Sequence, residues 1–128
     1  MNQEKKVFDN FLSNVTIGDH GFAMSLWDTA GPEEYSRLRV LSYIEADVFF
    51  VCFSVSSRSS FENISSKWHP ELMHHLKSFP GAKFLLVGTK YDLRGTKEAA
   101  GREVSFEEAK EKAEKLKMEG SRFLFVLV

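Results

Sequence analysis

Two short polar segments of this sequence carry side chains suited to binding a phosphorylated ligand. The first, Asp28–Gly31, directly follows an apolar run that ends at Trp27. A carboxylate at the end of a strand can reach the hydration shell of a phosphate-bound Mg²⁺. Because Gly31 has no side chain, its backbone N–H can approach a terminal phosphate closely. Taken alone, the segment is short, and a loop-capping role for Asp28 is about as frequent as a ligand contact.

The second segment, Thr89–Asp92, follows the apolar run 84–87. The Asp92 carboxylate can accept two hydrogen bonds from N1–H and the exocyclic amine of guanine, a donor pair that adenine lacks. The stem of Lys90 can lie along the face of the base while its ammonium group stays in a polar environment. Two such segments at successive strand ends predict a binding crevice at the carboxyl edge of an α/β sheet.

Apolar strand-like runs alternate with helix-like segments along the whole sequence. This order predicts one α/β domain over residues 1–128 with a largely parallel sheet. Near the N-terminus, the alternating runs 14–17 and 22–27 flank a turn-like segment that contains glycine and aspartate, which predicts a β-hairpin.

Three later runs are continuously apolar, as in strands buried on both faces. They are residues 49–55, 84–87 and 122–128. Cys52, the only cysteine, lies in the first of these runs, so we expect a buried, inert thiol and no internal disulfide.

Two helices have recognisable N-terminal signals. Capping-box sequences occur at Ser59–Glu62 and Ser105–Glu108, and each precedes apolar residues at helical spacing. Pro70 is expected to break or kink the first helix about halfway along, because proline removes a hydrogen bond and clashes with the preceding turn.

Composition disfavours several classes of function. Lys and Arg number 17 against 18 Asp and Glu, for a net charge of −1, and no basic stripe supports nucleic-acid binding. The histidines at 69, 74 and 75 are not spaced as two ligands on one helical face, so a metal site is not expected there. With no apolar run long enough to span a bilayer and no C-terminal cysteine for prenylation, we expect a cytoplasmic chain without a lipid anchor.

The order and spacing of the motifs carry a family resemblance. Asp28–Gly31 reads DTAG, and Thr89–Asp92 has the TKxD form of a guanine-recognition motif. Other matching segments are Val7–Asn10, Arg37–Tyr43, Phe61–Asn63 and Lys67–Glu71. Over most of its length the chain resembles the Rho branch of the Ras superfamily of small GTPases. The resemblance implies a P-loop-GTPase-like fold, a mostly parallel sheet flanked by helices, and GTP or GDP with Mg²⁺ as ligands. It also implies a role in signal transduction of the cytoskeletal type.

The resemblance assigns roles to individual residues. The nucleotide contacts would be Asp28, Thr29, Ala30, Gly31, Thr89, Lys90 and Asp92, and Asp28 would also bind Mg²⁺ indirectly. Effectors, exchange factors and GTPase-activating proteins of the Rho type would contact Phe8, Asp9, Asn10, Tyr35, Arg37, Leu38 and Leu41. An alternative for Leu38 and Leu41 is that they only pack a helix.

The sequence also departs from the family pattern where phosphates and water are handled. It contains no G-x-x-x-x-G-K-S/T phosphate loop. Lys6 stands where a Mg²⁺-binding Thr is expected, Pro32 stands in place of the catalytic Gln, and Leu127–Val128 replace a pair that helps to hold guanine. We therefore assign no catalytic residue and expect weak nucleotide binding without hydrolysis.

Further departures concern the fold. The link 94–105 is too short for the extra helix typical of Rho proteins. The first strand, the phosphate loop and the last helix have no counterpart, so the strands expected at 22–27 and 49–55 should each present an unpaired edge. Two functions follow: a Rho-type small GTPase, or alternatively a nucleotide-free interaction module or non-functional fragment that binds Rho regulators or effectors through residues 7–43.

Overall fold

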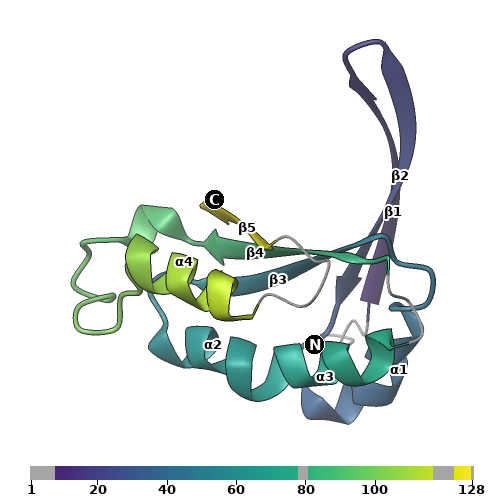
Figure 1. The fold of residues 1–128 in the computed structure, drawn as a ribbon. Coiled ribbons are helices and arrows are strands. Elements are labelled where there is room, and N and C mark those ends of the chain that lie inside the picture. Colours follow the sequence, from purple (N-terminus) through teal and green to yellow (C-terminus); the bar gives the residue numbers. More distant parts are fainter. Residues whose placement is uncertain (1–7, 78–80, 117–122, 128) are drawn as a thin grey trace, which may run out of the picture. The chain divides into compact units, whose positions relative to one another are not determined.

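The structure is a computed structural model that describes residues 8–77, 81–116 and 123–127. The chain divides into two compact units, Met1–Glu45 and Ala46–Val128, and each is described by itself. The first unit contains β1 (Phe8–Ile17), β2 (His20–Thr29), a 3-10 helix (Glu33–Tyr35) and α1 (Ser36–Leu41) (Figure 1). The second contains β3 (Val48–Ser54), α2 (Arg58–Asn63), a π-helical segment (Ile64–Trp68), α3 (His69–Leu76), β4 (Lys83–Thr89), a 3-10 helix (Tyr91–Leu93), α4 (Phe106–Lys115) and β5 (Phe123–Leu127).

The first unit is built on the predicted hairpin. Strands β1 and β2 pair antiparallel from Phe8 opposite Thr29 to Ile17 opposite His20, which leaves a two-residue turn. The first turn residue, Gly18, has φ of +59°, a conformation that glycine adopts without steric cost. The hairpin is therefore confirmed, and its strands are longer than the alternating runs in the sequence.

The second unit is a three-stranded parallel sheet in the order β3-β4-β5. Crossovers between parallel strands are right-handed with few exceptions, and both crossovers here step the same way across the sheet. Both therefore bring their helices to the same face, and α2, α3 and α4 lie together on one side of the strands (Figure 1). The predicted α/β class with a parallel sheet is confirmed.

The core of the second unit lies between the sheet and these helices. The Phe53 and Phe61 rings are 5.0 Å apart between β3 and α2, and Phe49 stacks on Phe84 at 5.5 Å between β3 and β4. Ile64 of the π-helical segment is fully buried. Alternate residues of β3 supply one wall of this core.

The exposure of side chains on the opposite face of β3 contradicts two predictions. Phe50 is 58% exposed whereas Phe53 is 2% exposed, and Cys52 lies on the exposed face with Phe50. The expectation that this strand is buried on both faces, with an inert buried thiol, is wrong. The physical reason is that α2, α3 and α4 all pack on the other face (Figure 1).

The helical run 58–76 corrects one more prediction. The helix begins at Arg58, and its N-cap is Ser57, which accepts a hydrogen bond from the Ser60 N–H, so no capping box forms at Ser59. The α-helix is interrupted just before Pro70, in line with the predicted break or kink. The helix α2 ends at Asn63, a π-helical segment follows in which the His69 N–H donates to the Ile64 carbonyl, and α3 begins with Pro70 in its first turn. The predicted capping box at Ser105–Glu108 is confirmed at the start of α4.

The strands form two separate sheets. Among the described residues, β2 has β1 as its strand partner and β3 has β4, so β2 and β3 are both edge strands. This agrees with the unpaired edges predicted for these two strands. No helix in the described ranges is both long and apolar enough to cross a membrane.

Candidate functional site

Thr89–Asp92, the segment predicted to recognise guanine, lies at the carboxyl end of β4 and is hydrogen-bonded to the neighbouring strand. Thr89 Oγ1 donates to the Phe53 carbonyl at 3.1 Å, and the Val55 N–H donates to the Thr89 carbonyl at 2.9 Å. The first bond ties the Thr89 side chain to β3, and the second extends the backbone ladder one residue past Ser54. The start of the segment therefore has a defined position relative to the sheet.

Lys90 reverses the chain directly after the strand. Its φ and ψ of 59° and 39° lie in the left-handed region, which costs a non-glycine residue about 1–2 kcal/mol. The turn leads into the 3-10 helix Tyr91–Leu93, in which the Leu93 N–H donates to the Lys90 carbonyl at 3.0 Å. Lys90 and Asp92 are both exposed, so their side chains are accessible to a ligand.

The chain behind this turn is anchored as well. Arg94 Nη2 donates to the Val104 carbonyl at 2.7 Å, and the Val104 N–H donates to the Val55 carbonyl at 2.9 Å. The Arg94 guanidinium also lies 5.4 Å from the centre of the Tyr91 ring. The link 94–105 consists of turns and extended chain with no helix, as expected from its length.

Asp28–Gly31 belongs to the first unit and follows the end of β2. Asp28 is exposed and stands directly opposite Asp9 in the strand pair. A Cβ built on Gly31 would meet nothing within 4 Å, so the fold itself does not require glycine there. A close approach by a ligand would supply such a requirement.

Arg39 holds the loop after Asp28 and was not identified from the sequence. It is buried, and its Nη1 donates to the Ala30 carbonyl at 2.7 Å and to the Pro32 carbonyl at 3.3 Å. The acceptors of these two bonds are backbone carbonyls, so the side-chain types in the sequence did not reveal them. Pro32 itself is exposed and precedes the 3-10 helix.

The residues predicted to contact regulators lie on β1 and around α1. Asp9 and Asn10 are on β1, where Asn10 Oδ1 accepts from Ser25 Oγ at 3.0 Å. Phe8 begins the strand, and its side chain lies outside the described part. Tyr35 ends the 3-10 helix, and Arg37, Leu38 and Leu41 are on α1.

The α1 leucines, for which the sequence left two interpretations, are both exposed. Leu38 is 42% exposed and Leu41 is 61% exposed. Both side chains are therefore accessible to a partner, and the choice between docking and packing stays a prediction.

The structure brings Thr89, Lys90 and Asp92 together at one strand end, while Asp28–Gly31 belongs to the other unit. The crevice expected to join both segments stays a prediction. Lys6 and Val128 lie outside the described residues.

A cluster of charged side chains, formed by Arg58, Glu108 and Lys112, joins α2 to α4. Arg58 Nη1 lies 2.5 Å from Glu108 Oε1, and the Arg58 guanidinium also donates to the Glu103 carbonyl. Hydrogen bonds from Arg58 and from the Ser105 N–H lower the pKa of Glu108 to about 2. Lys112 Nζ donates to the Phe61 carbonyl at 3.1 Å, and burial lowers the pKa of Lys112.

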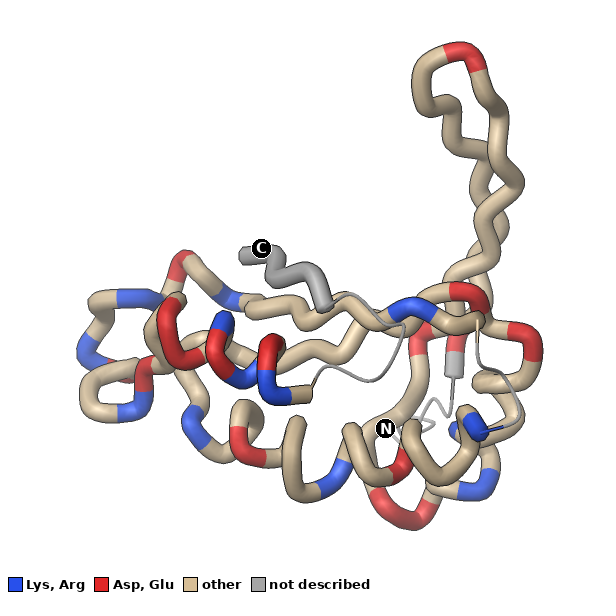
Figure 2. The backbone as a smooth tube through the Cα atoms, viewed as in Figure 1, with Lys and Arg blue, Asp and Glu red and all other residues tan. Residues whose placement is uncertain are grey.

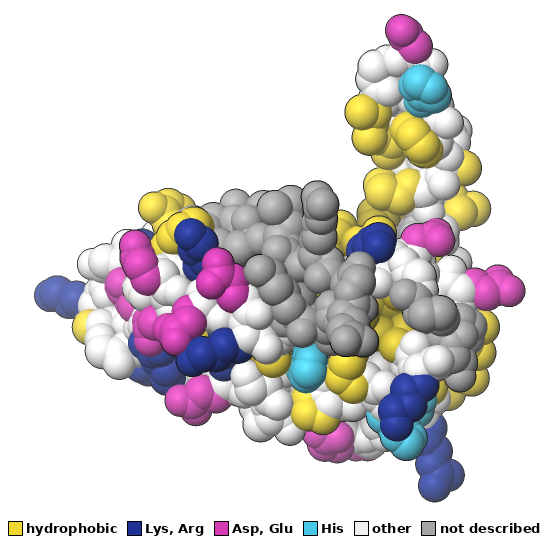
Figure 3. All heavy atoms as spheres, in the orientation of Figure 1, with side chains coloured by type: hydrophobic (Ala, Val, Ile, Leu, Met, Phe, Trp, Pro, Cys, Tyr) yellow, Lys and Arg dark blue, Asp and Glu magenta, His cyan; other side chains and the backbone are white. Residues whose placement is uncertain are grey.

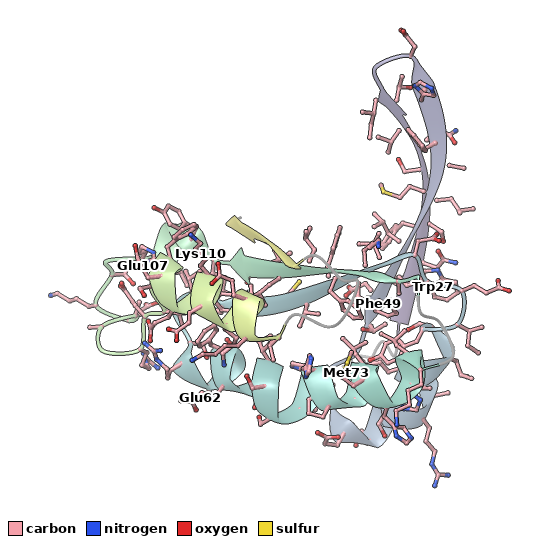
Figure 4. The ribbon with its side chains drawn as sticks, viewed as in Figure 1. Trp27, Phe49, Glu62, Met73, Glu107 and Lys110 are labelled. Atoms are coloured by element: carbon pink, nitrogen blue, oxygen red, sulfur yellow. The ribbon has the colours of Figure 1, made fainter. Side chains whose placement is uncertain are left out.

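This cluster fixes two helices and shows no reactive geometry, because Arg58, Glu108 and Lys112 each have a protein partner. The rest of α4 carries an interspersed set of acidic and basic side chains (Figure 2). Glu107 and Lys110 extend from it as exposed residues (Figure 4).

Metal-ligating side chains do not gather in the described ranges. No group of three or more His, Cys, Asp or Glu that could hold a metal ion occurs there. Burial lowers the pKa of His69, and its Nε2 is enclosed without a hydrogen-bond partner in the described part.

Comparison with known families gives one match that spans nearly the whole chain. The model described as "Ras family" matches residues 1–123. The match includes the segments Asp28–Gly31 and Thr89–Asp92.

Proposed function

Because this chain belongs to the Ras family of small GTPases, we propose that it is a Rho-type signalling module that recognises guanine nucleotides through Thr89–Asp92. The observation that carries the proposal is the anchored turn at the end of β4, which presents Lys90 and Asp92 to solvent. We propose that it acts in the cytoplasm, on regulators and effectors of the Rho type.

Base recognition follows from the chemistry of the turn. The Asp92 carboxylate offers two acceptor oxygens to the paired donors of guanine, and the Lys90 stem offers an apolar surface to the ring. The hydrogen bonds of Thr89 to β3 keep these groups in place before a ligand arrives, which reduces the entropy lost on binding.

The residues of this sequence are better suited to binding guanine than to binding the phosphates of a nucleotide with their Mg²⁺. Asp28 is the one residue assigned to Mg²⁺, and the phosphate-loop motif does not occur in the 128 residues. Pro32 has no polar side-chain atom with which to orient a water molecule. The proposed function is therefore nucleoside recognition, and we assign no step of hydrolysis.

A second candidate is a nucleotide-independent docking module, and the exposure of Leu38 and Leu41 favours it. Exposed apolar side chains on a short helix can anchor a partner protein at modest conformational cost. In this case the switch-like surface would bind Rho exchange factors or effectors in the absence of nucleotide.

Thermal melts with different ligands test nucleotide recognition. A ligand that binds only the folded state raises stability by RT ln(1 + [L]/Kd), about 2.7 kcal/mol at a hundredfold excess over Kd. We expect guanosine to raise the melting temperature about as much as GDP with Mg²⁺ does, and ADP to have no effect. Asp92→Asn should abolish the shift, whereas Asp47→Asn, at another exposed aspartate, should preserve it. Equal shifts with ADP and GDP would contradict base recognition.

Calorimetric titration with the catalytic domain of a Rho exchange factor tests the docking candidate. Leu41→Ala should weaken binding at least about tenfold, the effect of removing a buried interface anchor. Phe106→Ala on α4 removes a similarly exposed apolar side chain and should leave affinity unchanged. If binding requires GDP, the nucleotide-independent candidate fails while base recognition stands.

A further inference from the structure

The β1–β2 ribbon has one apolar and one mostly polar face. Residues that alternate along an antiparallel pair share a face, and the strand register assigns them. The apolar ribbon face consists of Phe11, Val15, Ile17, Phe22, Met24 and Leu26. The opposite face carries Asn10, Leu12, Asn14, Thr16, Ala23, Ser25 and Trp27. Figure 3 shows apolar side chains along the length of the ribbon.

Most of the apolar ribbon face is exposed in this unit, and Val15 near its middle is half-buried. Phe11 is 54% exposed, Phe22 52% and Ile17 67%. A two-stranded ribbon is marginally stable by itself, and contiguous exposed apolar surface of this kind marks an interaction site. The face therefore has a physical reason to be covered by a partner.

The charged residues of the ribbon disfavour some classes of partner. No Lys or Arg occurs between Phe8 and Thr29, so the ribbon offers no attraction to anionic lipid or to nucleic acid (Figure 2). On the apolar side, Asp9 and Asp28 lie at the base of the ribbon, and His20 lies at the tip. The two ends of the same face therefore carry complementary groups.

We propose that the apolar ribbon face binds the same face of a second copy of this chain, with the two ribbons antiparallel about a two-fold axis. The register makes this arrangement self-complementary. The pair Phe11 and Leu26 then packs on Val15 and Phe22 of the other copy, because both pairs lie one step from the centre.

The middle and the ends of the ribbon also match. The central pair, Ser13 and Met24, meets its own equivalent across the axis, and His20 of one copy comes to Asp9 and Asp28 of the other. An imidazole N–H can donate to a carboxylate, so this pairing adds a polar contact at each end of the interface.

The area of the apolar ribbon face sets the expected affinity of the dimer. Strands of this length, at ~3.4 Å per residue and ~4.8 Å apart, give a flat face of about 300 Å². Stable interfaces bury about 800 Å² on each partner. The dimer is therefore weak and forms at high protein concentration.

Sedimentation velocity of the full chain across a concentration series tests the dimer. The wild type should change from monomer to dimer as concentration rises. Met24→Glu places two like charges at the axis and should leave only monomer, whereas Ala23→Glu, next to it on the opposite face, should leave the dimer intact. An equimolar mixture of Met24→Glu and Met24→Lys should restore a dimer that neither variant forms alone.

A cross-linking measurement supports the same test if a charged variant fails to fold. In a Cys52→Ser background, Met24→Cys should be cross-linked to a dimer by a short bis-maleimide at least tenfold faster than Ala23→Cys. A wild type that stays monomeric at every concentration overturns the proposal. So does a dimer that survives Met24→Glu, or one that is lost with Phe50→Glu on β3 and not with Met24→Glu.

Discussion

At the scale of single residues, the candidate site depends on a backbone conformation as much as on side-chain chemistry. Lys90 is one of two described non-glycine residues with positive φ, and it sits between the last strand residue and Asp92. A lysine maintained in a conformation that favours glycine is consistent with a functional requirement for its side chain.

Replacing Lys90 by glycine should separate stability from function. We expect Lys90→Gly to raise the free energy of unfolding by about 0.5–1 kcal/mol, because glycine adopts the left-handed conformation without strain. Guanosine binding should fall in the same variant. Lys97→Gly, at an exposed lysine without positive φ, should instead lower stability in urea unfolding.

The Arg58–Glu108 pair predicts a pH dependence. Glu108 has a folded pKa of about 2 against an ordinary value of 4.5, so its contribution to stability is complete above pH 4.5 and is lost as the pH falls toward 2. The Glu108 side chain is 43% exposed, so solvent screening limits the contribution to about 0.5–1 kcal/mol. Glu108→Gln should flatten the stability profile over this range. Glu111→Gln, which removes the exposed pair with Lys115, should change it less.

At the scale of elements, the starts and irregularities of helices depend on which local bond forms in the folded chain. Several serines precede α2, and Ser57 is the one that caps it. The π-helical segment then separates α2 from α3, which begins one residue before Pro70. Both features leave Ile64 and Leu72 buried against the sheet side of the unit.

The position of the helix cap is open to a matched test. Ser57→Ala should lower the free energy of unfolding by about 1 kcal/mol through loss of the bond to the Ser60 N–H. Ser59→Ala, two residues later, should change it by less than about 0.5 kcal/mol. Equal effects in thermal or urea unfolding would mean that Ser57 is not the effective cap.

At the scale of the second unit, the direction of its crossovers decides which apolar residues are covered. Both crossovers place their helices on one face of the β3-β4-β5 sheet, so Phe53 is in the core and Phe50 is exposed. Two phenylalanines three positions apart in one strand therefore have different energetic roles.

Truncation of these two side chains should reveal the difference. Phe53→Ala should destabilise the chain by about 3–5 kcal/mol, the usual cost of a large cavity in a core. Phe50→Ala should change stability by less than about 0.5 kcal/mol and should increase solubility. Similar losses in urea unfolding would indicate that the Phe50 face is covered in solution.

The sequence by itself determined the features that depend on local pattern. The β1–β2 hairpin, the parallel strands and the Ser105–Glu108 capping box were all predictable, because strand periodicity and cap chemistry act over a few neighbouring residues. The resemblance to small GTPases followed from several short motifs in order, and the Ras family match over residues 1–123 agrees with it.

Only the tertiary structure decided which faces are covered and which distant groups meet. The continuous apolar run of β3 could not reveal that Cys52 is exposed, because burial depends on where the helices pack rather than on the strand. The bonds from Arg39 to two loop carbonyls and the 50-residue separation of Arg58 and Glu108 were hidden for the same reason. Contacts between residues far apart along the chain arise from packing, and packing is a property of the folded chain as a whole.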